Sequence, residues 1–257
     1  MFFKFWGNLR VALAFLTRFP HTHTCTEHDL KDALSYFFLA SLILGLILTL
    51  PILIITKLVA PNLPAPLMAA LSAWIWLGLE IYLTRALHWD GLADLIDALG
   101  SNKTGPKFWA IIKDSRLGTF GALGLILVLA GQFLTLTIHL TLDNYLCLIL
   151  APVFARQAPF WLAKDLPAYQ NSTLGAFFCQ AVAENKRLHQ LAALILISTP
   201  LFLSILFGLP QILFLLATEF LLLNKLKKIA LTYGGLSGDF CGAAIELSQL
   251  NFLLLTI

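Results

Sequence analysis

Charged residues are scarce in this sequence of 257 residues. Only 12% of the residues are Asp, Glu, Lys or Arg, 59% are hydrophobic, and the mean hydropathy is +0.84. A typical soluble domain has about 25% charged residues and about 45–50% apolar ones. The composition therefore excludes an ordinary soluble protein and indicates an integral membrane protein.

Cysteine is also rare, and the sequence has no obvious linker. The four cysteines, Cys25, Cys147, Cys179 and Cys241, are far apart and form no CxxC pair. This spacing supports neither a zinc site nor a disulfide framework, so we expect reduced thiols that serve in packing. Without an internal repeat, a low-complexity tract or a long Pro/Ser linker, we expect a single integral membrane domain over residues 1–257.

The apolar residues gather in seven stretches that are long enough, or nearly so, to cross a bilayer, which takes about 20 residues. They lie at about 34–56, 65–86, 119–140, 144–163, 188–207, 210–224 and 240–257. We therefore predict an all-α, polytopic membrane helix bundle with about seven transmembrane helices. The last stretch carries Glu246 and Gln249, so it could be buried among other helices rather than facing lipid.

The basic residues indicate the orientation of the bundle. The N-terminal segment, residues 1–33, is interrupted by Lys4, Arg10 and Arg18 and lacks a small-residue cleavage site, which favours an interfacial helix over a signal peptide. All Lys and Arg except Lys57 and Arg156 lie in this segment or in alternate loops. This bias predicts a cytoplasmic N-terminus at the inner membrane, with the motifs described below on the cytoplasmic side.

The densest group of acids lies in residues 88–97, HWDGLADLID. In a helix, Asp90, Asp94 and Asp97 would share one face within an arc of roughly 60°. Like charges this close repel one another, and a hard divalent cation is a candidate to offset them. His88, next to this group, could orient a ligand or could be an interfacial histidine with no role.

Two later segments mix charge with glycine. Residues 113–121, KDSRLGTFG, could bind phosphate through Lys113 and Arg116, or could simply anchor the start of a helix. Residues 234–246, GGLSGDFCGAAIE, place Asp239 where it could cap the last helix, with Glu246 on the same face. Together the three segments predict a metal-assisted phosphoryl-transfer site, and hard oxygen ligands favour Mg²⁺.

The runs HWDGLADLIDALG, KDSRLGTFG and GGLSGDFCGAAIELSQ, in this order, with AFLTRFP near the N-terminus, resemble the cobalamin synthase family, the adenosylcobinamide-GDP ribazoletransferases. The resemblance implies a Mg²⁺-dependent membrane enzyme. Its substrates would be adenosylcobinamide-GDP and α-ribazole or α-ribazole 5′-phosphate, and its products GMP and adenosylcobalamin or the 5′-phosphate of adenosylcobalamin. The DGLAD run is also similar to the core of CDP-alcohol phosphotransferases, with Asp94 where those have arginine.

The resemblance also implies roles for individual residues. Those expected as metal ligands are Asp90, Asp94, Asp97, Asp239 and Glu246, and those expected in cofactor binding are Gly91, Ser115 and Gly238. Lys113 and Arg116 would offset charge on the diphosphate, and the proton acceptor would be Asp97, Asp114 or His88, in that order. The sequence departs from the family pattern at Thr84-Arg85-Ala86, where two glycines are usual, at Ala98 for a common glycine, and at Gln249 for a common glutamate.

Two other functions fit parts of the sequence. A lipid-synthesising CDP-alcohol phosphotransferase would use the same metal chemistry. A secondary transporter would explain the ionisable residues inside apolar stretches, which are Glu80, Arg156, Glu219 and Glu246, as an ion pathway. We expect the lipid bilayer as a partner and no nucleic acid, and a homo-oligomer or a complex with other cobalamin-pathway enzymes stays open.

Overall fold

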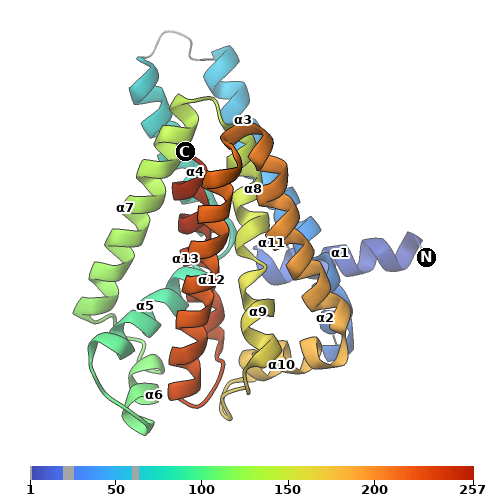
Figure 1. Cartoon of the computed structure of the whole chain (residues 1–257), viewed down its shortest axis with the longest axis vertical. Helices are drawn as coiled ribbons and strands as arrows, with labels where there is room; N and C mark the ends of the chain where they lie inside the picture. Colours follow the sequence, from blue (N-terminus) through green and yellow to red (C-terminus); the bar gives the residue numbers. More distant parts are fainter. Residues whose placement is uncertain (1, 20–25, 60–63) are drawn as a thin grey trace.

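The computed structural model describes residues 2–19, 26–59 and 64–257, and these residues are mostly helical (Figure 1). Within these ranges no strand forms, and the one β-bridge joins Ala168 to Leu236. The prediction of an all-α fold is therefore confirmed. Three of the cysteines, Cys147, Cys179 and Cys241, are free thiols, and Cys25 lies outside the described residues.

Six described segments are long and apolar enough to span a membrane: Glu27–Lys57, Ala65–Leu83, Thr119–Thr141, Tyr145–Asp165, Lys186–Ile205 and Leu209–Thr232. They contain helices α2 (Glu27–Ala33), α3 (Phe37–Ile54), α4 (Ala65–Leu83), α7 (Thr119–Thr141), α8 (Tyr145–Ala155), α9 (Ala158–Asp165), α11 (Lys186–Phe207) and α12 (Leu209–Thr232). Six of the predicted spans match these segments. Helix α12 continues past the predicted end at 224, because the lysines that follow extend the same helix beyond its apolar part.

The seventh predicted span corresponds to helix α13 (Gly238–Leu255), which is not among the six candidate spans. It runs through the middle of the bundle and contacts α5, α7, α8, α9, α10 and α12 (Figure 1). Its small residues Gly242, Ala243 and Ala244 are all buried, so neighbouring helices can approach closely. The polar residues of this stretch therefore lie against other helices.

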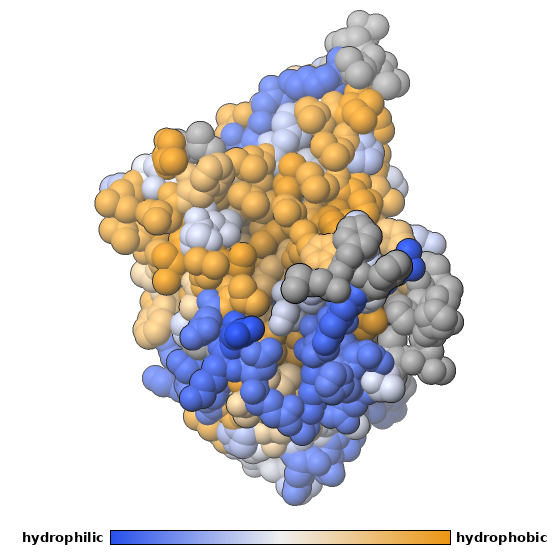
Figure 2. Space-filling model, turned by 90° about the vertical axis from the view of Figure 1, so that its right-hand side faces the viewer, coloured by the Kyte–Doolittle hydropathy of each residue, from blue (hydrophilic) through white to orange (hydrophobic). Residues whose placement is uncertain are grey.

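One end of the bundle is polar, and we call it the polar end. It contains α5 (Leu87–Gly100), α6 (Pro106–Ile112) and α10 (Thr173–Glu184), at the lower end of Figure 1. Figure 2 shows hydrophilic surface gathered over the lower part of the molecule, beneath a broad apolar belt. At the opposite end, Lys57 Nζ forms an ion pair with Asp143 Oδ2 at 2.7 Å. Most of the basic loops lie at the polar end.

Helix α1 (Phe2–Leu16) runs crosswise to the long helices (Figure 1). Its C-terminal end is tied to the end of α4, where the Arg18 amide donates a hydrogen bond to Leu83 O at 2.7 Å. Arg85 Nη2 donates to Phe15 O at 3.1 Å. These bonds hold the last turn of α1 against the polar half of the bundle.

The turn from α4 to α5 uses left-handed backbone at two residues that are not glycine. Arg85 has φ 59° and Ala86 has φ 54°. For L-residues this conformation costs roughly 1–2 kcal/mol each. Glycine at either position would adopt this backbone without the strain.

Replacing Ala86 by glycine should therefore raise the free energy of unfolding by up to about 1 kcal/mol, because the strain outweighs the extra entropy of glycine in the unfolded chain. Ala130, which is exposed in the interior of α7, is the matched control. There Ala130→Gly should lower the stability by about 0.5–1 kcal/mol. Denaturant unfolding of both variants in detergent micelles checks this, and equal destabilisation by the two substitutions would contradict it.

Candidate active site

Helices α5 and α13 are in direct backbone contact at two glycines. A Cβ atom on Gly91 would lie 2.8 Å from the Cα of Asp239, and one on Gly242 would lie 2.9 Å from the carbonyl oxygen of His88. Side chains at these positions would force the helices apart. The glycines therefore let the first and third sequence motifs meet, although these motifs are about 150 residues apart in the chain.

The meeting of the two helices gathers Asp90, Asp94 and Asp239, which we call the carboxylate cluster. Burial, together with the negative charges of Asp90, Asp239 and Asp97, raises the pKa of Asp94 to about 7. Burial also raises the pKa of Asp239, with a contribution from Asp90, although Ser237 Oγ donates to Asp239 Oδ2 at 2.8 Å. The cluster holds negative charge that a bound cation would offset.

The carboxylate cluster does not form a metal site from protein side chains alone. Among the described residues, no group of three or more His, Cys, Asp or Glu side chains is placed so that it could hold a metal ion. Mg²⁺ commonly keeps several waters and binds through one or two carboxylates together with substrate phosphates. Asp90 is exposed and Asp94 and Asp239 are partly exposed, so substrate oxygens could reach an ion beside them.

Asp97, predicted as a ligand or a base, caps the start of α7. Its Oδ2 accepts the amide hydrogen of Gly118 and its Oδ1 that of Gly121, each at 2.7 Å. A carboxylate in this position satisfies free N–H groups and interacts favourably with the helix dipole. A Cβ atom on either glycine would collide with this carboxylate. The glycines of the second motif therefore receive Asp97 and join that motif to the first.

Changing Asp97 to asparagine should lower the free energy of unfolding by about 1–2 kcal/mol, since the amide cannot accept at both positions and carries no charge. Asp143→Asn weakens the exposed pair with Lys57 and should cost less than about 1 kcal/mol. Unfolding in detergent, together with Mg²⁺ affinity by calorimetry, tests the difference. A loss of Mg²⁺ binding without a loss of stability would show that Asp97 is a metal ligand instead.

Asp114 and Arg116 pair with each other on the surface. Arg116 Nη2 lies 2.6 Å from Asp114 Oδ2 and its Nε donates to Asp114 Oδ1 at 2.9 Å, while the Arg116 side chain is 87% exposed. These hydrogen bonds lower the pKa of Asp114 to about 2, which makes it a weak proton acceptor. Ser115 between them is exposed. The pair shapes the loop that leads into α7.

A polar cleft lies beside the carboxylate cluster. Its polar lining residues are Lys113, Asn171, Ser172, Thr173, Ser237 and Asp239. Of the predicted site residues, Lys113 and Gly238 line it together with Asp239. The cleft is therefore placed to bring a phosphate between Lys113 and the carboxylate cluster.

Aromatic residues that the sequence patterns did not single out form one wall of the polar cleft. The rings of Trp109 and Tyr169 stack with centroids 3.5 Å apart, and Trp109 Nε1 donates to Tyr233 O at 2.9 Å. The bridge between Ala168 and Leu236 brings the loop of Tyr169 beside the third motif. The sequence of this loop contains no recognisable motif, so only the tertiary contact shows that Tyr169 lines the polar cleft.

A buried polar group, which we call the inner network, lies within the bundle. Gln249 Nε2 donates to Glu80 Oε2 at 2.7 Å, and Gln132 Nε2 donates to Glu246 Oε2 at 3.0 Å. Arg156 Nη2 lies 3.9 Å from Glu80 Oε1. Glu246, predicted near the metal, thus lies with these residues and is 2% exposed. At position 249 an amide can donate to Glu80, which an ionised glutamate could not do.

His88 lies between the inner network and the carboxylate cluster. Its Nδ1 is 3.5 Å from Glu246 Oε1, and burial, with the positive charge of Arg156, lowers its pKa to about 3. The ring is therefore neutral at physiological pH. Glu219 forms a separate group, where it accepts hydrogen bonds from Gln157, Ser248 and Asn251.

The model of the cobalamin-5-phosphate synthase family matches residues 8–257. The chain belongs to the cobalamin-5-phosphate synthase family. Members similar to it include the adenosylcobinamide-GDP ribazoletransferase of Nitratidesulfovibrio vulgaris strain DP4, 34% identical over 245 residues, covering 94% of this chain and 93% of the relative. That of Syntrophobacter fumaroxidans is 36% identical over 256 residues, covering 96% and 97%. That of Desulfitobacterium hafniense is 34% identical over 253 residues, covering 96% and 95%. No solved structure matches the chain.

Family membership confirms the resemblance inferred from the three motifs. In this member of the family the three motifs meet at one place. Gly91 and Gly242 let α5 and α13 touch, and Asp97 of α5 accepts an amide hydrogen at the start of α7. Asp90, Asp94 and Asp239 converge there and Lys113 borders the adjoining cleft. Arg116, Asp114 and Ser115 remain on the surface loop, and Glu246 lies in the inner network.

Proposed function

We propose that this chain joins adenosylcobinamide-GDP to α-ribazole or its 5′-phosphate and releases GMP. The observation that carries the proposal is the convergence of the three family motifs on the carboxylate cluster beside the polar cleft. The names of the similar ribazoletransferases supply the substrates. The product would be adenosylcobalamin or its 5′-phosphate.

In the proposed reaction a ribazole hydroxyl oxygen attacks the phosphorus that carries the cobinamide. The bond from this phosphorus to the GMP oxygen breaks, GMP leaves with the bonding electrons, and the hydroxyl proton passes to an acceptor. One or two carboxylates of the cluster, Asp94 among them, would hold Mg²⁺ together with substrate oxygens, and the ion would supply positive charge that offsets the charge of the diphosphate. Lys113, in the wall of the same cleft, would offset charge that develops on the departing phosphate.

The other predicted site residues take supporting roles in this proposal. Asp97 holds the start of α7 and Asp114 fixes Arg116, and because both carboxylates already accept hydrogen bonds we assign them positioning roles. Gly91 allows the helix contact that forms the carboxylate cluster. The basic residues at the polar end favour an active site facing the cytoplasm, at the inner membrane of a bacterial cell.

The test is to incubate the purified protein, in detergent or nanodiscs, with both substrates and to measure GMP release with Mg²⁺ or with EDTA. We expect turnover only when both substrates and the metal are present. Undiminished turnover in EDTA would overturn the metal role. A parallel assay with a CDP-linked lipid donor separates this function from a CDP-alcohol phosphotransferase, and flux into proteoliposomes without GMP formation would favour a transporter.

A further inference from the structure

A second polar pocket, which we call the outer pocket, opens at the polar end beside the polar cleft. It is lined by the start of α6, the loop between α9 and α10, and the turn between α12 and α13. Its volume is about 470 Å³, which is within the range of small-molecule pockets. Trp109, Tyr169 and Asn171 line both the outer pocket and the polar cleft, so the two adjoin along these residues. A ligand in the outer pocket can therefore extend into the cleft towards Lys113 and Asp239.

Two tyrosine rings line the outer pocket, and each is backed by a ring of α6. Tyr169 stacks on Trp109 with ring centroids 3.5 Å apart, and Tyr233 stacks on Phe108 with centroids 3.7 Å apart. Trp109 is 6% exposed and Phe108 is fully buried, whereas both tyrosines are partly exposed. Each tyrosine ring is thus held from behind and offers a surface on which a flat base can stack.

The third motif holds Tyr169 in this position. The Tyr169 amide donates a hydrogen bond to Leu236 O at 2.9 Å, and the Leu236 amide donates to Pro167 O at 2.8 Å. Gly235 has φ 131°, and a Cβ atom on it would lie 2.5 Å from Pro167 O. Glycine therefore lets the loop lie directly against the motif. The same short segment that carries Asp239 fixes the place of Tyr169.

The rim of the outer pocket is polar. Gln170 and Asn171 are exposed there, and their side-chain amides can both donate and accept hydrogen bonds. Guanine carries N–H donors and acceptor atoms around its edge. The dimethylbenzimidazole base of the ribazole carries two methyl groups and only one free ring nitrogen. A flat base with a polar edge, such as guanine, therefore fits this pocket better than the ribazole base does.

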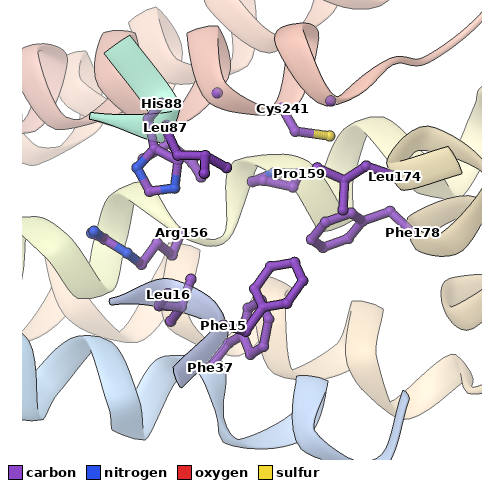
Figure 3. Close-up of a pocket in the computed structure, with 13 residues that line it drawn as sticks. Phe15, Leu16, Phe37, Leu87, His88, Arg156, Pro159, Leu174, Phe178 and Cys241 are labelled. Carbon is purple, nitrogen blue, oxygen red and sulfur yellow. The ribbon is translucent and has the colours of Figure 1, made fainter. Parts of the chain in front are cut away.

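The cavity lined by Phe15, Phe37 and Phe178 does not offer another place for a base. Figure 3 shows these rings close to one another, and the Phe15 and Phe37 centroids lie 5.3 Å apart. The volume of this cavity is only about 40 Å³, which is room for a few water molecules. The rings there serve in packing.

We infer that the outer pocket receives the guanine base of adenosylcobinamide-GDP. This inference rests on the proposed function and adds the place where the leaving nucleotide binds. The base stacks on Tyr169 with its edge towards Gln170, and the ribose and phosphates run along the polar cleft. The diphosphate then lies between Lys113 and the carboxylate cluster. After the reaction GMP is held in the pocket that opens at the polar end, where it can leave.

Calorimetry with GMP tests the inference without turnover. The wild-type protein should bind GMP about tenfold more tightly than ribose 5-phosphate, which has the sugar and phosphate but no base. Tyr169→Leu should weaken GMP binding about tenfold and leave ribose 5-phosphate binding unchanged, whereas Tyr169→Phe keeps the ring and should bind GMP normally. Tyr145, partly exposed beside Lys57 at the opposite end, is the matched control, and Tyr145→Leu should change neither affinity.

Steady-state GMP release, with each substrate varied in turn, distinguishes guanine from the ribazole base. Tyr169→Leu should raise KM for adenosylcobinamide-GDP about tenfold, and Gln170→Ala should raise it about threefold through the loss of a hydrogen bond. Both variants should leave KM for α-ribazole unchanged. A rise in KM for α-ribazole alone would place the ribazole base in the outer pocket and overturn the inference.

The remaining outcomes separate the inference from the proposed function. Normal GMP release with unchanged KM values and GMP affinity in both variants would overturn the inference and leave the proposed function intact. No GMP release by the wild-type protein, with GMP binding that Tyr169→Leu weakens, would overturn the proposed function and support the guanine site. Equal wild-type affinities for GMP and ribose 5-phosphate would overturn the inference even if the Tyr169 variants do not fold.

Discussion

Asp94→Asn should reduce kcat/KM for GMP release on the order of 10³-fold, the largest effect of any single substitution that we expect. Asparagine keeps the size of the side chain but removes the negative charge through which Asp94 would hold Mg²⁺ against the diphosphate. The steady-state rate over a range of Mg²⁺ concentrations measures the effect. Asp165→Asn is the control, because Asp165 pairs with Lys227 away from the carboxylate cluster and should keep near-normal activity.

The same variant should be more stable than the wild-type protein when metal is absent. The pKa of Asp94 is raised to about 7 from an ordinary value of 3.8, so ionisation of this group disfavours the folded state. The stability of the metal-free wild type therefore falls as the pH rises from about 4 through about 7, and asparagine removes this loss. Thermal unfolding in EDTA at pH 8 should show a higher midpoint for Asp94→Asn. For the activity prediction, an Asp94→Asn variant that keeps more than a tenth of the wild-type activity would contradict the role of Asp94 as a metal ligand.

Hydropathy predicted the long helices because each one must present mostly apolar side chains over the width of a bilayer. It could not distinguish α13 from a helix that faces lipid. The polar residues of α13 signalled burial, but only the packed bundle shows that Glu246 lies with Gln132 while Asp239 lies with Asp94. Asp239 and Glu246 are seven residues apart in α13, which is about 10 Å along the helix axis. Lying on the same face of the helix therefore did not place both acids in the same site.

Helical spacing correctly predicted that Asp90 and Asp94 lie near each other, but it could not assign Asp97. The two amides that Asp97 caps belong to residues 21 and 24 positions later in the chain, so no local pattern contains this contact. Trp109 and Tyr169 were missed for the same reason, since their stacking depends on how a loop folds back onto α6. Local periodicity thus located the carboxylates, and tertiary contacts decided their partners.

Gly91→Ala should lower kcat on the order of 10²-fold although it removes no polar group. The new methyl group would lie 2.8 Å from Asp239 Cα and 3.1 Å from Asp239 O, and these backbone atoms can yield only if α5 and α13 separate. A displacement of about 1 Å between reacting groups is enough for a loss of this size. Overpacking should also lower the free energy of unfolding by about 1–3 kcal/mol.

Gly78→Ala is the matched control for this substitution. Gly78 lies within α4, and a Cβ atom there would meet nothing within 4 Å, so alanine should leave kcat unchanged and stabilise the helix by up to about 1 kcal/mol. Comparing kcat and denaturant unfolding for both variants separates a loss of geometry from a loss of folded protein. Normal kcat in Gly91→Ala would mean that the contact between α5 and α13 does not position the carboxylate cluster, because Asp90 and Asp94 reach Asp239 only across that contact.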